Sequence, residues 1–255
     1  MTQPLTPGQQ LLADTESLTP GSPLAAADSV ASRIIDEIGG SASLLSADLD
    51  LKTPSAAAPS EDPMTAEAVV TAVLPGRGTT LRTEVTAHLA GGGVDGSVLR
   101  FAFASEPDDS ATVSGLLCPA GKEWNAELRT RLSADEEFAR LIETYDGTIG
   151  LSIGARPVHI RCYRGQVLEV VSRAVKGADF VLDIPGEVFI DLMTSQQNTF
   201  METAMLGRMK SSGSGYEYLR MTSALIRIVD HARGLAAAAG YAGAHTSADE
   251  RTEVA

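Results

Sequence analysis

The hydrophobic residues of this chain follow a helical period in some segments and alternate with polar residues in others. Residues 25–40 carry apolar side chains at helical spacing and end at a Gly-Gly pair, which predicts a helix. A shorter helix is predicted around residues 8–17. Alternating positions joined by glycine-rich turns then predict an antiparallel meander, with strands in residues 42–54, 65–76, 80–90 and 96–105.

The second half of the chain starts with apolar residues at helical spacing, which predict one or two amphipathic helices in residues 123–147. A four-stranded meander is predicted next, in residues 148–154, 156–165, 166–174 and 178–186. The period then becomes helical and predicts two short helices, residues 187–195 and 198–206, before a candidate fifth strand in 207–213. A long helix is predicted from Tyr216 to about Ala239, with Leu219, Leu225 and Val229 on its inner stripe.

These elements predict an α+β protein with two different domains, since the sequence has no internal repeat. Composition places the boundaries between its parts. The expected segments are a flexible N-terminus in residues 1–18, a first domain in 19–104, an acidic, serine-rich linker in 105–122, a second domain in 123–239 and a disordered tail in 240–255.

Charge and cysteine usage narrow the class of function. The chain has 255 residues and a formal net charge of −13, which argues against nucleic acid or an anionic membrane as partner. Neither Cys118 nor Cys162 has a neighbour at metal-ligand spacing, so we predict no metal site and no cofactor. Two isolated thiols suit a reducing compartment, although one disulfide stays open at this point. With no signal-peptide pattern and no apolar run of transmembrane length, we expect a cytoplasmic protein.

Methionine is concentrated in one part of the second half. Five of the seven methionines lie in or beside residues 198–213, namely Met193, Met201, Met205, Met209 and Met221. Two interpretations are open. These side chains fill an irregular core, or their flexible thioethers line a space that fits apolar ligands of varying shape.

The second half resembles the sterol carrier protein type 2 family of small lipid-binding domains. The similarity covers roughly residues 123–238 and rests on the element order and on two stretches, YDGTIGLSIGARPVHIRCYRGQVLEVV and ADFVLDIPGEVFIDLMTSQQNTFMETAMLGRMKSSGS. The resemblance implies a twisted sheet covered on one face by helices, with an apolar tunnel between the layers. The lipid-binding candidates on the covering helices are Phe189, Leu192, Met193, Phe200, Met201, Met205, Leu225 and Val229.

The first half resembles a degenerate hotdog domain of the phenylacetyl-CoA thioesterase type. The similarity spans residues 19–104, in which LDLKTP followed by MTAEAVVTAVLPGRG matches the family's strand pattern. Asp28 occupies the position of the family's acidic residue, as nucleophile or general base, and Gly21 that of an oxyanion donor. The preceding family motif H-G-G falls on Thr19-Pro20-Gly21, where only the glycine agrees. Asp28 also has a structural interpretation, because a carboxylate in the first turn of a helix is favoured by the helix dipole.

Three functions follow from these resemblances. The first is binding of a hydrophobic acyl or sterol-like ligand in the second domain, with the hotdog-like domain as a dimerisation or second ligand-binding module. The second is an acyl thioester hydrolase that uses Asp28, with a coenzyme A or carrier-protein thioester as substrate. The third is an isomerase or cyclase acting on a hydrophobic intermediate. The missing H-G-G favours binding, and the hotdog resemblance implies a homo-oligomer.

Overall fold

The computed structural model describes residues 5–12, 23–39, 42–52, 63–76, 80–92, 94–106 and 114–244. The chain forms two compact units, Met1–Val113 and Ser114–Ala255. Each unit contains its own five-stranded sheet, so the expected α+β class with two antiparallel-rich sheets is confirmed. Residues 245–255 of the expected tail, residues 107–113 of the expected linker and most of residues 1–18 lie outside the described residues.

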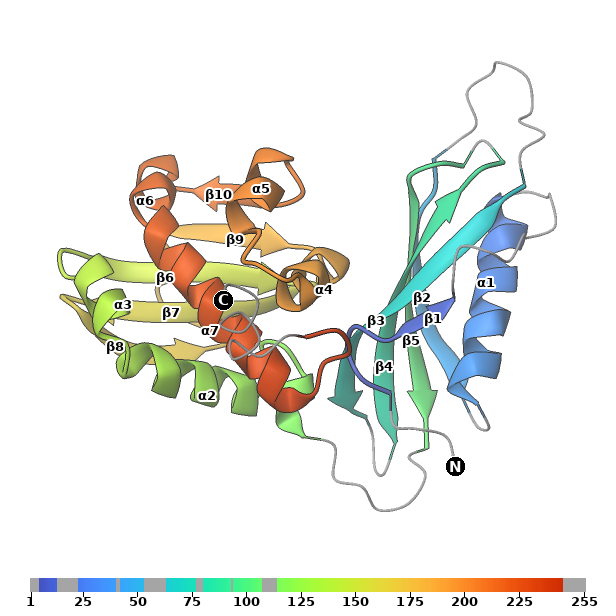
Figure 1. Cartoon of the computed structure of the whole chain (residues 1–255), viewed down its shortest axis with the longest axis horizontal. Helices are drawn as coiled ribbons and strands as arrows, with labels where there is room; N and C mark the ends of the chain where they lie inside the picture. Colours follow the sequence, from blue (N-terminus) through green and yellow to red (C-terminus); the bar gives the residue numbers. More distant parts are fainter. Residues whose placement is uncertain are drawn as a thin grey trace, which may run out of the picture. The chain divides into compact units, whose positions relative to one another are not determined.

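The N-terminal unit combines one long helix with an antiparallel sheet. Its sheet order is β1-β3-β4-β5-β2, which makes β1 and β2 the two edges. The elements along the chain are β1 (Gln10–Leu12), α1 (Pro23–Ile38), β2 (Ser43–Asp50), β3 (Thr65–Pro75), β4 (Leu81–Ala90) and β5 (Ser97–Ser105) (Figure 1). The four strands expected between residues 42 and 105 are therefore present. The helix expected around residues 8–17 is wrong, because Gln10–Leu12 form the strand β1.

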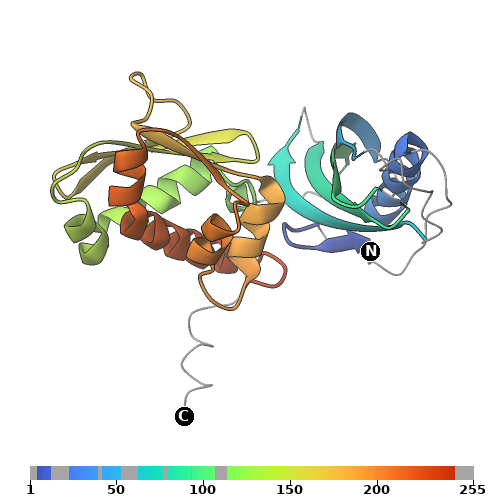
Figure 2. The same cartoon turned by 90° about the horizontal axis from the view of Figure 1, so that it is seen from above.

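Burial explains why α1 forms where the pattern predicts a helix, and why β1 forms where the pattern does not predict a strand. Val30 and Ile34, one turn apart on α1, are fully buried, and the helix packs against β1, β2 and β5. Leu11 and Leu12 are buried as well, and β1 pairs with β3 at the edge of the sheet. A three-residue strand carries too little alternation to be told from a helix, so tertiary pairing decides its conformation. Figure 2 shows the curvature of the strands beside α1.

The C-terminal unit places helices against a mixed sheet. In chain order its elements are η1 (Gly115–Leu117), α2 (Lys122–Ser133), α3 (Glu136–Leu141), β6 (Asp146–Ile153), β7 (Arg156–Tyr163), β8 (Gln166–Val171), β9 (Phe180–Ile184), α4 (Gly186–Thr194), α5 (Phe200–Met205), β10 (Lys210–Gly213), α6 (Gly215–Arg220) and α7 (Thr222–Ala239). Figure 2 shows α2, α5 and α7 on the same side of the sheet. The candidate fifth strand is thus present as β10.

The sheet of this unit is not a simple meander. Its order is β10-β9-β6-β7-β8, and β9 pairs with β6 in parallel, from Ile149↔Phe180 to Ile153↔Ile184. The meander prediction is therefore wrong at β9, because the chain crosses over after β8 and returns beside β6. This crossover brings the apolar residues of β6 and β9 side by side beneath the helices.

The predicted long closing helix is divided into α6 and α7 at Met221, where the backbone leaves helical geometry (φ −93°, ψ 9°). As a consequence the inner stripe begins later than expected. Leu219 is exposed, whereas Leu225 and Val229 are buried. Among the described residues, no helix has both the length and the apolar character needed to span a membrane.

Candidate hydrophobic binding site

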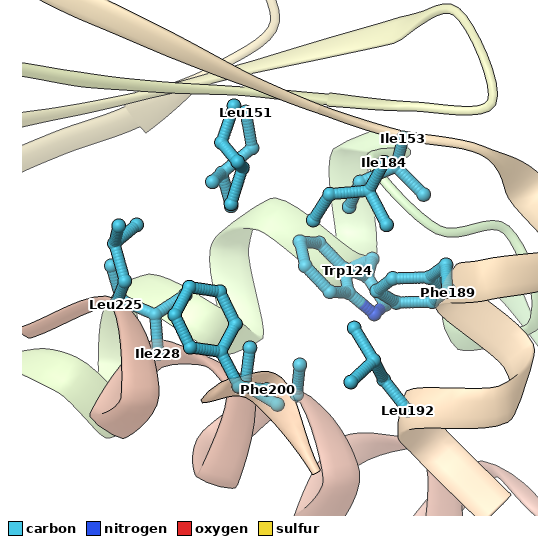
Figure 3. Close-up of a pocket in the computed structure, with 12 residues that line it drawn as sticks. Trp124, Leu151, Ile153, Ile184, Phe189, Leu192, Phe200, Leu225 and Ile228 are labelled. Carbon is cyan, nitrogen blue, oxygen red and sulfur yellow. The ribbon is translucent and has the colours of Figure 1, made fainter. Parts of the chain in front are cut away.

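A small pocket inside the C-terminal unit is lined by hydrophobic residues. They come from the central strands β6 and β9 on one side and from α2, α4, α5 and α7 on the other (Figure 3). The twelve lining residues are Trp124, Leu151, Ile153, Leu182, Ile184, Phe189, Leu192, Phe200, Leu225, Ile228, Val229 and Ala232. A site without a titratable lining group can hold an apolar molecule but offers no acid, base or nucleophile.

Aromatic packing closes one end of this interior. The rings of Trp124 on α2 and Phe189 on α4 meet edge to face, with centroids 6.2 Å apart at 67°. Phe200, the first residue of α5, points between the sheet and α7 (Figure 3). All three side chains are almost completely buried. Each is therefore part of the core and of the candidate site at once.

The remaining free volume in this interior is about 10 Å³. That volume is close to the minimum that holds one water molecule. Within residues 114–244, this lining therefore does not enclose the open apolar tunnel implied by the family resemblance, because the side chains interdigitate and fill the space. A hydrocarbon ligand could enter only if some of the covering side chains moved away.

The structure brings five of the eight lipid-binding candidates to this lining, namely Phe189, Leu192, Phe200, Leu225 and Val229. Met193 is buried but lies outside the lining. The expected inward position of Met201 and Met205 is corrected, since their exposed fractions are 46% and 82%. The physical reason is helix geometry: α5 turns Phe200 and Thr203 inward, which leaves the intervening methionine and the one at the C-terminal end on its outer side.

The strand side of the lining was not singled out from the sequence. Leu151 and Ile153 on β6, like Leu182 and Ile184 on β9, are two residues apart and therefore point to one face of the sheet. Their alternation was visible in the sequence, but only the parallel pairing of the two strands places them together. Trp124, the single tryptophan, was assigned to a helix without a role in the site.

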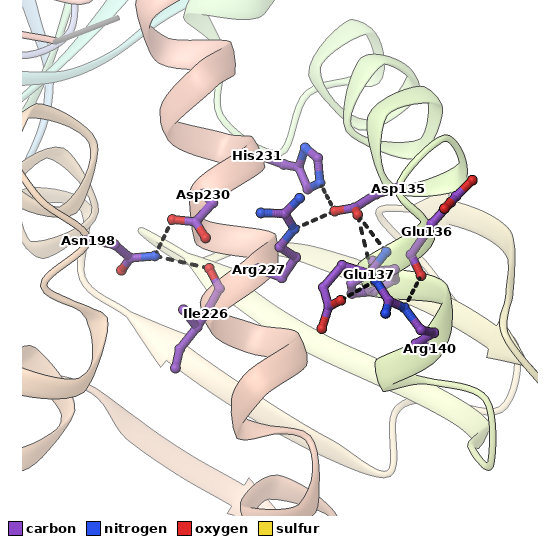
Figure 4. Close-up of polar contacts among 10 residues, drawn as sticks. Asp135, Glu136, Glu137, Arg140, Asn198, Ile226, Arg227, Asp230 and His231 are labelled. Atoms are coloured by element: carbon purple, nitrogen blue, oxygen red, sulfur yellow. Dashed lines mark hydrogen bonds and ion pairs between the residues drawn. The ribbon is translucent and has the colours of Figure 1, made fainter. Parts of the chain in front are cut away.

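Polar contacts hold the segment between α4 and α5 against α7. Asn198 donates to the carbonyl oxygen of Ile226 (3.1 Å) and to Oδ1 of Asp230 (2.7 Å) (Figure 4). The Arg233 guanidinium donates to the carbonyl oxygens of Leu192 (2.8 Å) and Gln196 (3.0 Å). These contacts fix the start of α5 and so position Phe200 over the interior.

A second polar cluster joins α7 to the start of α3. Asp135 accepts hydrogen bonds from Arg227 Nε (2.5 Å), lies 2.6 Å from His231 Nε2, and caps α3 through the backbone N–H of Phe138 (Figure 4). Burial alone would raise the pKa of Asp135. The hydrogen bonds from Arg227, His231 and Phe138 outweigh that effect and hold the pKa well below its ordinary value. This cluster does not border the apolar interior, and we assign it a structural role.

Both cysteines lie in the interior of the C-terminal unit. Cys118 and Cys162 are buried and are not joined in a disulfide. Burial raises the pKa of Cys162 to about 12, so its thiolate is scarce at neutral pH.

A second apolar site lies in the N-terminal unit, between α1 and the edge strand β2. It is an open groove of about 530 Å³ lined by Leu24, Ala25, Ala27, Asp28, Ala31, Leu44, Ala47, Leu49 and Phe101. Asp28 is the one charged residue of this lining and is exposed. The predicted oxyanion residue Gly21 lies outside the described residues, as do Thr19 and Pro20.

No protein-family model and no curated protein matches this sequence. Among solved structures, the chain is similar to a crystal structure of sterol carrier protein 2, with 15% identity and a TM-score of 0.39 over 45% of this chain and 96% of that one. A second is the solution structure of a conserved hypothetical protein from Thermus thermophilus, described as possibly a sterol carrier protein, with 16% identity, a TM-score of 0.37, and coverage of 45% and 87%. A third is the sterol carrier protein domain 2 of Helicoverpa armigera, with 20% identity, a TM-score of 0.33, and coverage of 42% and 85%. These likenesses cover less than half of this chain and give it no function by themselves.

Proposed function

We propose that this chain binds a hydrophobic ligand of the acyl or sterol-like kind between the sheet and the helices of its C-terminal unit. The observation that carries the proposal is the lining itself, twelve apolar side chains drawn from two strands and four helices. Each CH₂ group that such a lining removes from water contributes about 0.8 kcal/mol. Space for a ligand could open by the movement of a single element, because that element supplies only one of the twelve side chains and the other eleven could stay in place.

That element is α5, which is six residues long. Within it, Phe200 and Thr203 are buried, while the rest of the helix is partly or fully exposed. A cavity of about 150 Å³ lined by Leu, Ile and Phe admits benzene, and withdrawal of the Phe200 ring would open a space on that order. The proposed ligand therefore replaces Phe200 rather than filling a preformed tunnel.

The test is uptake of a fluorescent fatty-acid analogue by the full chain, together with native mass spectrometry of lipid carried through purification. Phe200→Ala should take up the analogue more strongly than the wild type, because the ring no longer competes for the space. Phe138→Ala is the matched control, since Phe138 is equally buried but lies on α3, outside the lining. Both changes should cost about 3–5 kcal/mol of stability.

Phe200→Leu removes less volume and keeps the test usable if the alanine variant does not fold. Enhanced uptake by the Phe200 variants and not by Phe138→Ala supports the proposal. If neither the wild type nor the Phe200 variants take up analogue or carry lipid, the proposal is wrong.

The groove of the N-terminal unit favours a second candidate function, hydrolysis of an acyl thioester. A carboxylate beside an apolar groove of about 530 Å³ is the arrangement in which Asp28 could activate water, or attack the thioester carbonyl, while the groove holds the acyl chain. One helix packed on a curved five-stranded sheet supports the hotdog resemblance. Asp28→Asn should abolish hydrolysis in an assay with a panel of acyl-CoA thioesters. Undiminished hydrolysis by this variant would exclude Asp28 as the catalytic residue.

The exposed edge strand β2 of the same unit supports the proposal that the chain forms a homo-oligomer. Seven of the eight residues of β2 are exposed, including Leu44 and Leu45, and the strand lies at an edge of its sheet. Such an edge can pair with a second copy. Sedimentation velocity on the wild type and on Leu45→Asp tests this, and an unchanged oligomeric state in the variant would argue against the β2 edge as the contact.

A further inference from the structure

Large apolar side chains are exposed at one end of the C-terminal unit. Five of the eight that the structure describes in this unit fall within nineteen residues, on and beside α5 and α6: Met201, Met205, Leu206, Tyr216 and Leu219. We define these five residues as the α5–α6 surface. Figure 1 places α5 and α6 at the same end of the unit, on either side of β10. The strand between them, β10, has four residues and spans about 13 Å.

A concentration of exposed apolar residues of this kind marks an interaction site. Its electrostatic setting is different from that of the chain as a whole. Residues 200–220 contain two acidic residues and three basic ones, whereas the chain carries a net charge of −13. Arg208 is paired with Asp191 on α4 (2.6 Å), and Arg220 with Glu217 (3.1 Å). The surface is therefore close to neutral, and the acidic excess of the chain lies mainly before residue 114, where five basic residues stand against fifteen acidic ones.

The residues at the edge of the surface suit a lipid bilayer more than a protein partner. Tyr216 supplies an amphipathic ring of the type enriched at the membrane–water interface. Lys210 is exposed on β10, and a lysine stem can lie along apolar surface while its ammonium reaches a headgroup phosphate. A neutral patch also avoids the repulsion that the rest of the chain would meet at an anionic surface.

The α5–α6 surface is continuous with the proposed ligand site through α5. Phe200 lies on the inner side of this helix and lines the apolar interior, while Met201 and Met205 lie on its outer side. A ligand that displaced Phe200 would therefore pass beside these outer methionines. We propose that the α5–α6 surface docks on a lipid bilayer, which serves as the source or acceptor of the ligand. The role of the bilayer as source or acceptor rests on the proposed ligand binding, whereas the docking itself is inferred from the exposed surface.

Flotation of the full chain with phosphatidylcholine vesicles tests the docking directly. The wild type should float with the vesicles, and Met205→Asp and Leu219→Asp should each weaken the association about tenfold, since each replaces an apolar contact with the bilayer by a charge. Val175→Asp is the matched control, because Val175 is fully exposed in the same unit but lies outside the α5–α6 surface. It should float as the wild type does.

The docking is overturned if the wild type does not float, if the two surface variants float equally well, or if Val175→Asp is weakened as much as they are. It is also overturned if Met205→Asp dissociates an oligomer in sedimentation velocity without changing flotation, because the surface then binds a second copy. Uptake of the fatty-acid analogue without vesicles separates this proposal from the previous one. Uptake without flotation refutes the docking alone, and flotation without uptake refutes ligand binding alone.

Discussion

The two apolar sites of this chain differ in their free volume and in the residues that line them. In the C-terminal unit, twelve apolar side chains enclose about 10 Å³, whereas the groove of the N-terminal unit borders about 530 Å³ and includes the carboxylate of Asp28. The first has an apolar lining without room for a hydrocarbon chain, and the second has room and an exposed carboxylate. Apolar composition and available volume are therefore separate properties, and a binding function needs both in at least one state of the protein.

The largest effect on the free energy of unfolding is expected when a charge is placed in each site, which tests the comparison directly. Leu192→Asp should destabilise the C-terminal unit by roughly 5 kcal/mol or more, because the Leu192 side chain is fully buried and lines the apolar interior. Leu44→Asp in the groove should change stability by no more than about 0.5 kcal/mol, since that side chain is 44% exposed. Urea unfolding followed by Trp124 fluorescence reports on the first, and circular dichroism on the second. Equal costs would mean that the interior is as open as the groove.

A smaller effect is expected at the polar cluster that joins α7 to α3. The pKa of Asp135 is lower in the folded state than in the unfolded chain, so the stabilisation that this carboxylate provides is fully present above the unfolded pKa of about 4. It is lost progressively as the pH falls from there toward the folded value. Asp135→Asn should cost about 2–4 kcal/mol at neutral pH and flatten this acid dependence.

Glu137→Gln is the control for Asp135→Asn, since Glu137 pairs with Arg140 on the exposed face of α3. This variant should lose less than about 1 kcal/mol. The measurement is urea unfolding of both variants and the wild type between neutral pH and pH about 3. An unchanged acid dependence in Asp135→Asn would show that the network does not lower the pKa of Asp135.

The smallest effect is expected on the outer side of α5. Met201→Gln should change the free energy of unfolding by at most about 0.5 kcal/mol, because the side chain is 46% exposed and does not line the interior. Thermal unfolding of the full chain measures it. A loss above about 2 kcal/mol would instead indicate a core position, as the sequence pattern had suggested.

Local periodicity predicted most elements of this fold, and the differences are of non-local origin. Strand β1 was missed because three residues carry no readable period, and its pairing with β3 decides it. The parallel pairing of β9 with β6 joins segments about thirty residues apart, which no local pattern encodes. The same limit applies to the candidate site. Helical spacing correctly predicted the inward positions of Leu225 and Val229. It does not define the rotation of α5 about its axis, so the predicted inward positions of Met201 and Met205 were wrong.

The volume of the interior was equally beyond the sequence. A methionine or phenylalanine has the same identity whether it lines a hollow or fills one, and the difference lies in the packing of several elements at once. Phe200 illustrates this, since its position over the interior depends on Asn198 and Arg233, which bind backbone carbonyl oxygens. Contacts of that kind leave no motif. The hydrophobic class of the site could thus be predicted, but its closed state could not.

The position of α7 at the end of the described chain has a consequence for biosynthesis. This helix supplies four of the twelve side chains around the interior and packs against α2, which is made about a hundred residues earlier. While the ribosome is still adding residues 222–239, the apolar faces of β6 and β9 lack their last cover. The nascent C-terminal unit is therefore exposed to aggregation or chaperone capture until translation has passed α7.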